Sequence, residues 1–186
     1  MHIADAQREG RFRFAGGFYG QAVSGVLWFV SAALATWSTP KAAIMFLVFG
    51  GFFIFPITEL LIRAGGSKPL SSENSLPQLG RQVAFVLPFS MPLLVPVGQF
   101  RLTLFYPALM ILLGAHYIPF VFLYGMRMFA VLAAALLGGG LITAMYLPDS
   151  FSIGAWYTAA MLLIFAMVGR VLVDREQKAS ATREAV

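Results

Sequence analysis

Two ionisable side chains lie inside long apolar stretches of this sequence, where they could carry chemistry. His116 is the only histidine within such a stretch, because His2 is terminal, and Glu59 is the only acidic residue within one. An unperturbed imidazole has a pKa of about 6.5, so it can bind a ligand or pass protons at physiological pH. The alternative for His116 is a neutral ring that only hydrogen-bonds between helices.

Glu59 has two candidate partners. Arg63 follows it by four residues, the favourable order for an ion pair along one helix, and we favour this pairing at a membrane interface. In the alternative, Glu59 faces His116, because both lie in the inner halves of stretches that would run in the same direction. Sequence spacing leaves both arrangements open.

The third apolar stretch is rich in proline. Three prolines lie four residues apart between residues 88 and 96. Each lacks an N–H and crowds the carbonyl four residues earlier, so the stretch should be kinked. Freed carbonyls near Ser90 could bind a cation or a solute donor in a wet cavity, as in discontinuous transporter helices, or the stretch could be a kinked packing helix. The expected kink-forming residues are Pro56, Pro88, Pro92, Pro96 and Pro119.

Small residues recur at helical spacing in the first and fifth apolar stretches. Such stripes let helices approach closely, either within the chain or between copies of it in a homo-oligomer. The packing residues expected are Gly16, Gly20, Ser24, Ala130, Ala134 and Gly138.

The composition indicates that membrane helices position these residues. Apolar residues form 59% of the 186-residue chain and charged residues only 11%, which nearly excludes a water-soluble globule. About 20 apolar residues span a bilayer, so we predict an all-α bundle of six transmembrane helices, with the third and fourth kinked by proline. The expected spans are residues 14–37, 41–62, 82–98, 102–124, 128–147 and 151–173, between an N-terminal segment at 1–13 and a polar tail at 174–186.

The basic residues predict an orientation. Eleven of the 13 lysines and arginines fall on one side of the six spans, and only Lys41 and Arg101 fall on the other. This asymmetry places both termini in the cytoplasm and explains the net charge of +5 without a nucleic-acid partner. The first apolar run exceeds 20 residues, longer than the core of a signal peptide, so we expect it to be kept as a span.

Several chemistries have little support in the sequence. The chain has no cysteine, which removes disulfides, thiolate nucleophiles and sulfur-ligated metals. It also lacks a phosphate-binding loop, a dinucleotide-binding glycine motif and a zinc-protease motif. We therefore expect neither a metal nor another cofactor, and an intramembrane enzyme is the weakest functional class.

The stretch Gly114-Ala-His-Tyr-Ile-Pro-Phe-Val-Phe-Leu-Tyr124 resembles a family of small bacterial multi-spanning membrane proteins of unknown function. Phe55-Pro56, Asn74 and Pro77-Gln-Leu-Gly80 add to this resemblance, which extends over residues 14–170. It implies a six-helix protein of the bacterial inner membrane and no particular reaction. Members of that family carry a basic residue after the tyrosine, where this chain has Gly125.

Two functional classes remain for a chain of this kind. The first is a protein that handles a small solute or ion in a cavity between the second, third and fourth spans. Its candidate residues are His116, Glu59, Ser90 and Tyr124. The second is a non-transporting membrane protein that binds a partner or lipid. The sixth span has no proline to match the third, which weakens the case for an inverted-repeat transporter.

Overall fold

The computed structural model of the protein describes residues 1–67, 69–147 and 149–184, and these residues form helices joined by short turns. The α-helices are α1 (Ile3–Arg13), α2 (Phe18–Trp37), α3 (Pro40–Ala64), α4 (Leu76–Ser90), α5 (Leu94–Phe100), α6 (Phe105–Tyr124), α7 (Met128–Tyr146) and α8 (Ile153–Glu184). Short 3₁₀ turns are η1 (Ala15–Gly17), η2 (Met91–Leu93) and η3 (Leu102–Leu104).

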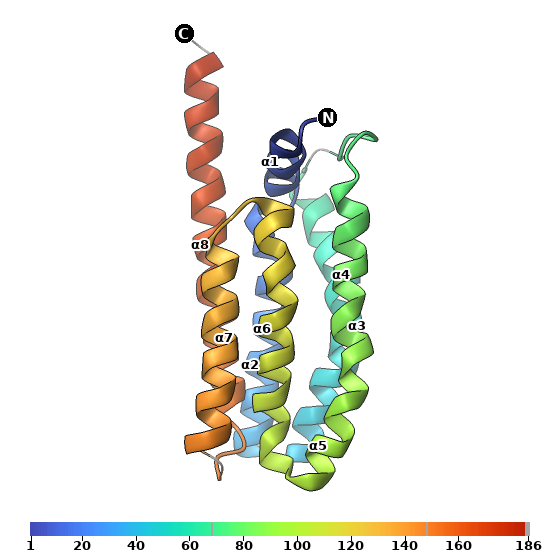
Figure 1. The fold of residues 1–186 in the computed structure, drawn as a ribbon, viewed down its shortest axis with the longest axis vertical. Helices are drawn as coiled ribbons and strands as arrows, with labels where there is room; N and C mark the ends of the chain where they lie inside the picture. Colours follow the sequence, from blue (N-terminus) through green and yellow to red (C-terminus); the bar gives the residue numbers. More distant parts are fainter. Residues whose placement is uncertain (68, 148, 185–186) are drawn as a thin grey trace.

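Six helical segments are long and apolar enough to cross a membrane, which confirms the predicted all-α, six-span fold. They lie side by side, and both termini are at one end of the bundle (Figure 1). We call this the basic end, because Arg11, Arg63 and Arg127 lie there. The chain is an integral membrane protein, because water could not cover this much apolar surface.

Two helices extend beyond the spans that the sequence predicts. The helix of the third span begins at Leu76, before the predicted start at residue 82, because Pro77 lies in its first turn and the Asn74 Oδ1 accepts a hydrogen bond from the Leu76 N–H. The sixth helix continues to Glu184 instead of ending at residue 173. Its last turns are polar, but glutamate, glutamine, lysine and alanine are strong helix formers. This part of α8 projects beyond the other helices (Figure 1).

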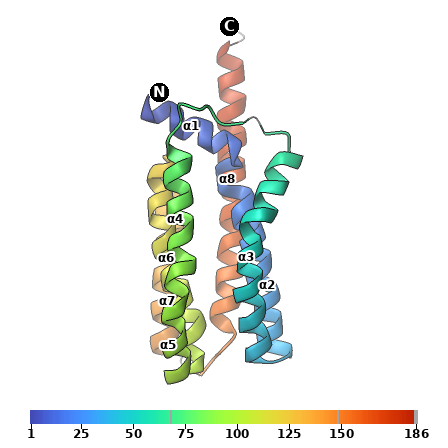
Figure 2. The same cartoon turned by 90° about the vertical axis from the view of Figure 1, so that its right-hand side faces the viewer.

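The spans form two groups. One contains α4 to α7, in which α6 packs along α7, and the other contains α2, α3 and α8, in which α2 packs along both neighbours. Contacts between α7 and α8 join the groups, and Figure 2 shows α8 between the two sides. Glycines permit the close approaches: a Cβ added to Gly16 would lie 2.7 Å from the Gly169 carbonyl oxygen.

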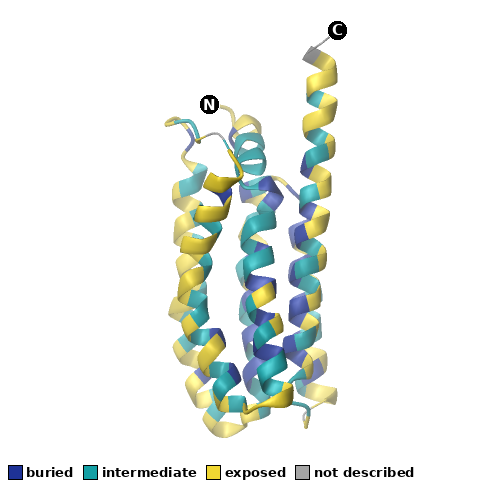
Figure 3. Cartoon of the chain, turned by 180° about the vertical axis from the view of Figure 1, so that it is seen from behind, coloured by how far each residue is buried: buried dark blue, intermediate teal, exposed yellow. Residues whose placement is uncertain are grey.

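The core lies between α2, α6, α7 and α8. Tyr106, Met110, Phe129 and Leu132 are fully buried there. By contrast, only 6% of the most apolar part of α3 is buried, whereas 44% of the corresponding part of the span that contains α6 is buried. Figure 3 shows the exposed surface running along the outer helices. In a membrane this exposed apolar surface faces lipid.

The third span is divided rather than continuous. The α-helix α4 ends at Ser90, a 3₁₀ turn covers Met91–Leu93, and α5 continues to Phe100. Pro88 lies in the last turn of α4, and Pro92 lies within the 3₁₀ turn. In contrast, α6 continues through Pro119 and α3 through Pro56.

A left-handed turn redirects the chain between α1 and α2. Ala15, Gly16 and Gly17 have φ of 48°, 64° and 85°. Such a backbone suits glycine, and Ala15 adopts it at a cost of about 1 to 2 kcal/mol. As a result α1 lies across the basic end of the bundle instead of extending α2 (Figure 2).

Candidate functional site

One face of α2 carries polar residues into the core. Gln21, Ser24, Trp28 and Ser31 are three or four residues apart, so they share a helical face, and all four are buried. The Ser31 hydroxyl lies 2.6 Å from the Tyr106 hydroxyl and donates to the Ala43 carbonyl oxygen at 3.0 Å. Towards the end of the bundle away from the termini, the polar Ser31 hydroxyl on this face therefore has hydrogen-bond partners.

Gln21, on the same face, is different. Its side chain is 2% exposed, yet neither its Oε1 nor its Nε2 has a hydrogen-bond partner among the described residues. A buried polar group without a partner costs roughly 1 to 3 kcal/mol. A carboxamide in this position therefore calls for a partner that is not part of the chain, such as water or a polar solute.

Two other helices carry unpaired polar atoms in the same half of the bundle. The Thr58 Oγ1 in α3 and the His116 Nδ1 in α6 are buried without a partner among the described residues. At a rise of 1.5 Å per residue, Thr58 and His116 lie about 9 and 12 Å from the basic ends of α3 and α6, and Gln21 lies about 4 to 5 Å from the start of α2. We call these three residues the inner polar layer.

Contacts around α2 show how the layer is arranged. A Cβ added to Gly20 would lie 4.0 Å from the Thr58 Oγ1, which places this hydroxyl beside the residue that precedes Gln21. A Cβ added to Gly17 would lie 3.0 Å from Phe129 Cζ and 4.0 Å from Gln21 Cδ. Position 17 is therefore packed closely against the tip of a phenyl ring, with the Gln21 side chain at van der Waals distance.

An aromatic cluster joins this region to His116. We define the cluster as Tyr117, Phe120, Tyr124 and Phe129. Phe129 stacks on Tyr124 with ring centroids 5.3 Å apart, and its centroid lies 5.7 Å from that of Phe120. The His116 ring packs on Phe120 at 5.2 Å and lies next to the backbone of Val83 in α4. His116 therefore sits between α6 and α4, at the edge of the cluster.

Glu59 forms ion pairs at the basic end. Its Oε1 accepts from Arg63 Nε at 2.9 Å, the pairing that the sequence spacing favoured, and from Arg13 Nη2 at 3.2 Å. No ion pair or hydrogen bond between described residues joins Glu59 to His116. In the described part of α3, Thr58, the neighbour of Glu59, carries a buried hydroxyl without a hydrogen-bond partner.

The short helix α1 covers the basic end through polar contacts that the sequence analysis did not identify. Arg11 binds both carboxylate oxygens of Glu176 at 2.6 and 3.0 Å and donates to the Tyr124 carbonyl oxygen at 2.8 Å. Asn74 donates to Glu9 Oε2 at 2.6 Å and to the Ala6 carbonyl oxygen. Residues more than 60 positions apart meet here, so helical spacing gave no signal, although Asn74 had contributed to the family resemblance.

The two remaining candidates from the sequence, Tyr124 and Ser90, lie in different parts of the structure. Tyr124 belongs to the aromatic cluster, whereas the Ser90 hydroxyl donates to the Val86 carbonyl oxygen within α4, two turns from Val83. Tyr124 and His116 each contact Phe120 but lie about two turns apart in α6, and Ser90 lies apart from the inner polar layer. Gln21 was not identified from the sequence, although a glutamine inside an apolar span was a visible signal.

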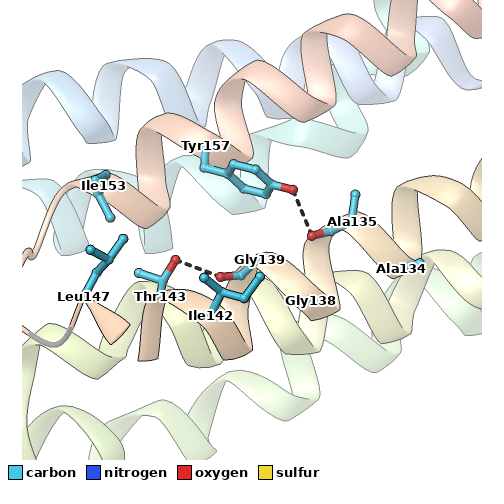
Figure 4. Close-up of a pocket in the computed structure, with 9 residues that line it drawn as sticks. All are labelled: Ala134, Ala135, Gly138, Gly139, Ile142, Thr143, Leu147, Ile153 and Tyr157. Carbon is cyan, nitrogen blue, oxygen red and sulfur yellow. Dashed lines mark hydrogen bonds between the residues drawn. The ribbon is translucent and has the colours of Figure 1, made fainter. Parts of the chain in front are cut away.

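The two small-residue stripes have different surroundings. Gly16 meets α8, Gly20 meets α3, and Ser24 is buried. The second stripe faces outward, and its members Ala134 and Gly138 line a groove of ≈ 470 Å³ between α7 and α8 (Figure 4). The remaining lining residues are Ala135, Gly139, Ile142, Thr143, Leu147, Ile153 and Tyr157. Its polar atoms are internally bonded: Tyr157 Oη donates to the Ala135 carbonyl oxygen at 3.0 Å.

The inner polar layer offers neutral hydrogen-bonding groups beside aromatic rings. Within the described part of the chain, no group of three or more histidine, aspartate or glutamate side chains could hold a metal ion. The available donors and acceptors are a carboxamide, a hydroxyl and an imidazole. Each of these groups can hydrogen-bond to water or to a polar solute.

A family model described as a family of unknown function (DUF7010) matches residues 3–171, so the chain belongs to that family. No curated protein and no solved structure gives a match.

Proposed function

We propose that this membrane protein handles a small solute or ion at the inner polar layer. The observation that carries the proposal is the presence of buried polar atoms without a partner among the described residues on three spans, α2, α3 and α6, in the half of the bundle nearer the basic end. In a bilayer each such group must find a partner, and water or a solute is the partner that the chain does not supply. His116 and Tyr124 of the original candidates belong to this region, and His116 is our proposed proton- or ligand-binding residue.

The orientation that we propose follows from the basic residues. With both termini in the cytoplasm of a bacterial inner membrane, the layer lies in the cytoplasmic half of the bilayer. Glu59 then serves as an interfacial ion-pair residue beside the layer. Because α1 lies across this end, a solute from the cytoplasm would pass between α1 and the spans.

The divided third span extends the proposal. Proline at position 88 leaves the Ala84 carbonyl without its helical donor, and Pro92 does the same for Pro88. If these carbonyls line the solute path, a cysteine placed at Ser90 reacts with a hydrophilic thiol reagent. If the cysteine at this position does not react, the proposed solute path is limited to the inner polar layer.

A second candidate function, binding a lipid or a partner protein, is favoured by one different observation. The groove between α7 and α8 is apolar and lined by small residues, which suits an acyl chain or another helix. This function needs no hydrated layer, so the same experiment separates the two candidates.

The experiment measures thiol accessibility in a chain that has no cysteine of its own. Thr58→Cys and His116→Cys are each reacted with a small charged methanethiosulfonate in membranes open to the cytoplasmic face. Matched controls are Ala159→Cys, at a position 1% exposed in α8, and Phe52→Cys, at a position 68% exposed towards lipid.

We expect both layer cysteines to react well above both controls, because water reaches the layer. Equal labelling at the layer and at the two controls would refute the proposal and leave the lipid- or partner-binding function. Folding of each variant is checked by its elution as a single species in detergent.

A further inference from the structure

The helix α1 lies between the two groups of spans at the basic end. Although α3 and α4 are consecutive helices, they are not close backbone neighbours in the described part of the chain. Instead, α3 packs on α2 in one group and α4 packs on α6 in the other. Figure 2 shows α3 and α4 on opposite sides, with α1 across the top between them. On this side of the basic end, α1 therefore bridges the two groups.

Polar contacts attach α1 to both groups. Arg11 Nη1 donates to the Tyr124 carbonyl oxygen, at the end of α6, at 2.8 Å. The same guanidinium forms an ion pair with Glu176 of α8, and Arg13 forms one with Glu59 of α3 at 3.2 Å. Arg11 thus connects α6 directly to α8. The carboxylate side chains of these two pairs are 35% and 28% exposed, so water and salt weaken the pairs.

Little apolar surface supports these polar contacts, and the turn after α1 is fixed. Ala6 is the one buried residue among the 11 residues of α1, all of which are described, and Phe12 is partly buried. An element with few buried apolar contacts detaches more easily than the rest of a fold. In the turn η1, a Cβ added to Gly16 would lie 2.7 Å from the Gly169 carbonyl oxygen of α8. We therefore expect α1 to pivot at Phe14 while η1 and the spans stay in place.

We propose that α1 is a releasable strap, which when docked closes the basic end over the inner polar layer and when released opens that end to water. Its contacts lie over two helices of the layer: Glu59 follows Thr58 in α3, and Tyr124 lies about two turns from His116 in α6. Only the docked state has the ion pair with Glu176, so loss of this pair raises the released fraction by up to about fivefold. This inference rests on the proposed function, because it concerns access to the same layer.

The first measurement detects release of α1 with trypsin, using the full-length protein in detergent. Glu176→Gln removes the partner of Arg11 and leaves every arginine of α1 in place, and Glu176→Lys adds a like charge. Mass spectrometry follows the cut after Arg11, whose rate reports the released fraction. We expect this cut to be about threefold to fivefold faster in Glu176→Gln than in the parent, and faster still in Glu176→Lys. The matched control is Asp174→Asn, which removes the ion pair with Arg170 within α8 and should leave the rate unchanged.

The second measurement adds the same changes to His116→Cys and follows its reaction with the charged methanethiosulfonate. We expect each Glu176 variant to speed this labelling by the factor by which it speeds the trypsin cut, and Asp174→Asn to leave the labelling unchanged. A trypsin cut as slow in both Glu176 variants as in the parent would overturn the strap, and so would a faster cut without faster labelling.

The labelling also separates failure of the strap from failure of the proposed function. If His116→Cys reacts faster than the lipid-facing and core controls, but equally in all variants, the strap is overturned and the hydrated layer stands. If it reacts no faster than those controls in any variant, both are overturned.

Discussion

Replacing Gln21 by methionine should stabilise the protein when no ligand is bound. Both amide atoms of Gln21 are buried and unpaired, and each such atom costs roughly 1 to 3 kcal/mol. Methionine has similar length and no strong hydrogen-bonding group, so we expect a gain of about 2 kcal/mol in the free energy of unfolding. With roughly 2 to 4 °C per kcal/mol for a chain of this size, the unfolding midpoint should rise by about 4 to 8 °C.

The matched control is Ser31→Ala on the same face of α2. The Ser31 hydroxyl makes two hydrogen bonds, to the Tyr106 hydroxyl and to the Ala43 carbonyl oxygen. Its removal leaves buried groups unpaired, so the midpoint should fall by a similar amount. Both variants are compared by thermal unfolding in the same detergent, followed by tryptophan fluorescence. If Gln21→Met lowers the midpoint as Ser31→Ala does, Gln21 is a satisfied structural residue and the reasoning is wrong.

Three further predictions concern packing, electrostatics and orientation. Gly16→Ala should lower the free energy of unfolding by about 2 to 5 kcal/mol, because its Cβ would lie 2.7 Å from the Gly169 carbonyl oxygen at a φ of 64°. The control Gly138→Ala, whose Cβ meets nothing within 4 Å, should be as stable as the parent. Equal losses in the two variants would contradict the α2–α8 packing. In a double-mutant cycle, the effects of Arg11→Gln and Glu176→Gln on the free energy of unfolding should be coupled by about 1 kcal/mol, and this coupling should be weaker at high salt. Additive effects would mean that this ion pair does not hold α1 in place. A reporter fused after α8 should be cytoplasmic and one inserted between α7 and α8 external; a periplasmic C-terminus would contradict the proposed orientation.

The fold was more predictable from the sequence than the site, for a physical reason. A bilayer forces each apolar stretch of about 20 residues into a helix, so the six spans could be recognised from local composition. The start of α4 at Leu76 and the length of α8 were missed because polar helices outside a membrane carry no hydropathy signal. The pairing of Glu59 with Arg63 was accessible because it lies within one helix.

The site depends on which helices are neighbours, and spacing along the chain does not determine this. His116 was identified because it is the one histidine in a span, yet its contact with α4 required the fold. Gln21 becomes notable only once its burial and its missing partners are known. Arg11 and Glu176 lie 165 residues apart and meet because α1 crosses the basic end.

Solute uptake by liposomes that contain the purified protein tests the central claim most directly. Acetamide, urea, glycerol, Na⁺ and K⁺ are each offered at neutral pH to the parent protein and to His116→Gln. The account predicts that at least one solute enters faster than in protein-free liposomes, and that His116→Gln stays folded but takes up this solute more slowly than the parent. Uptake equal to that of protein-free liposomes for every solute would contradict it.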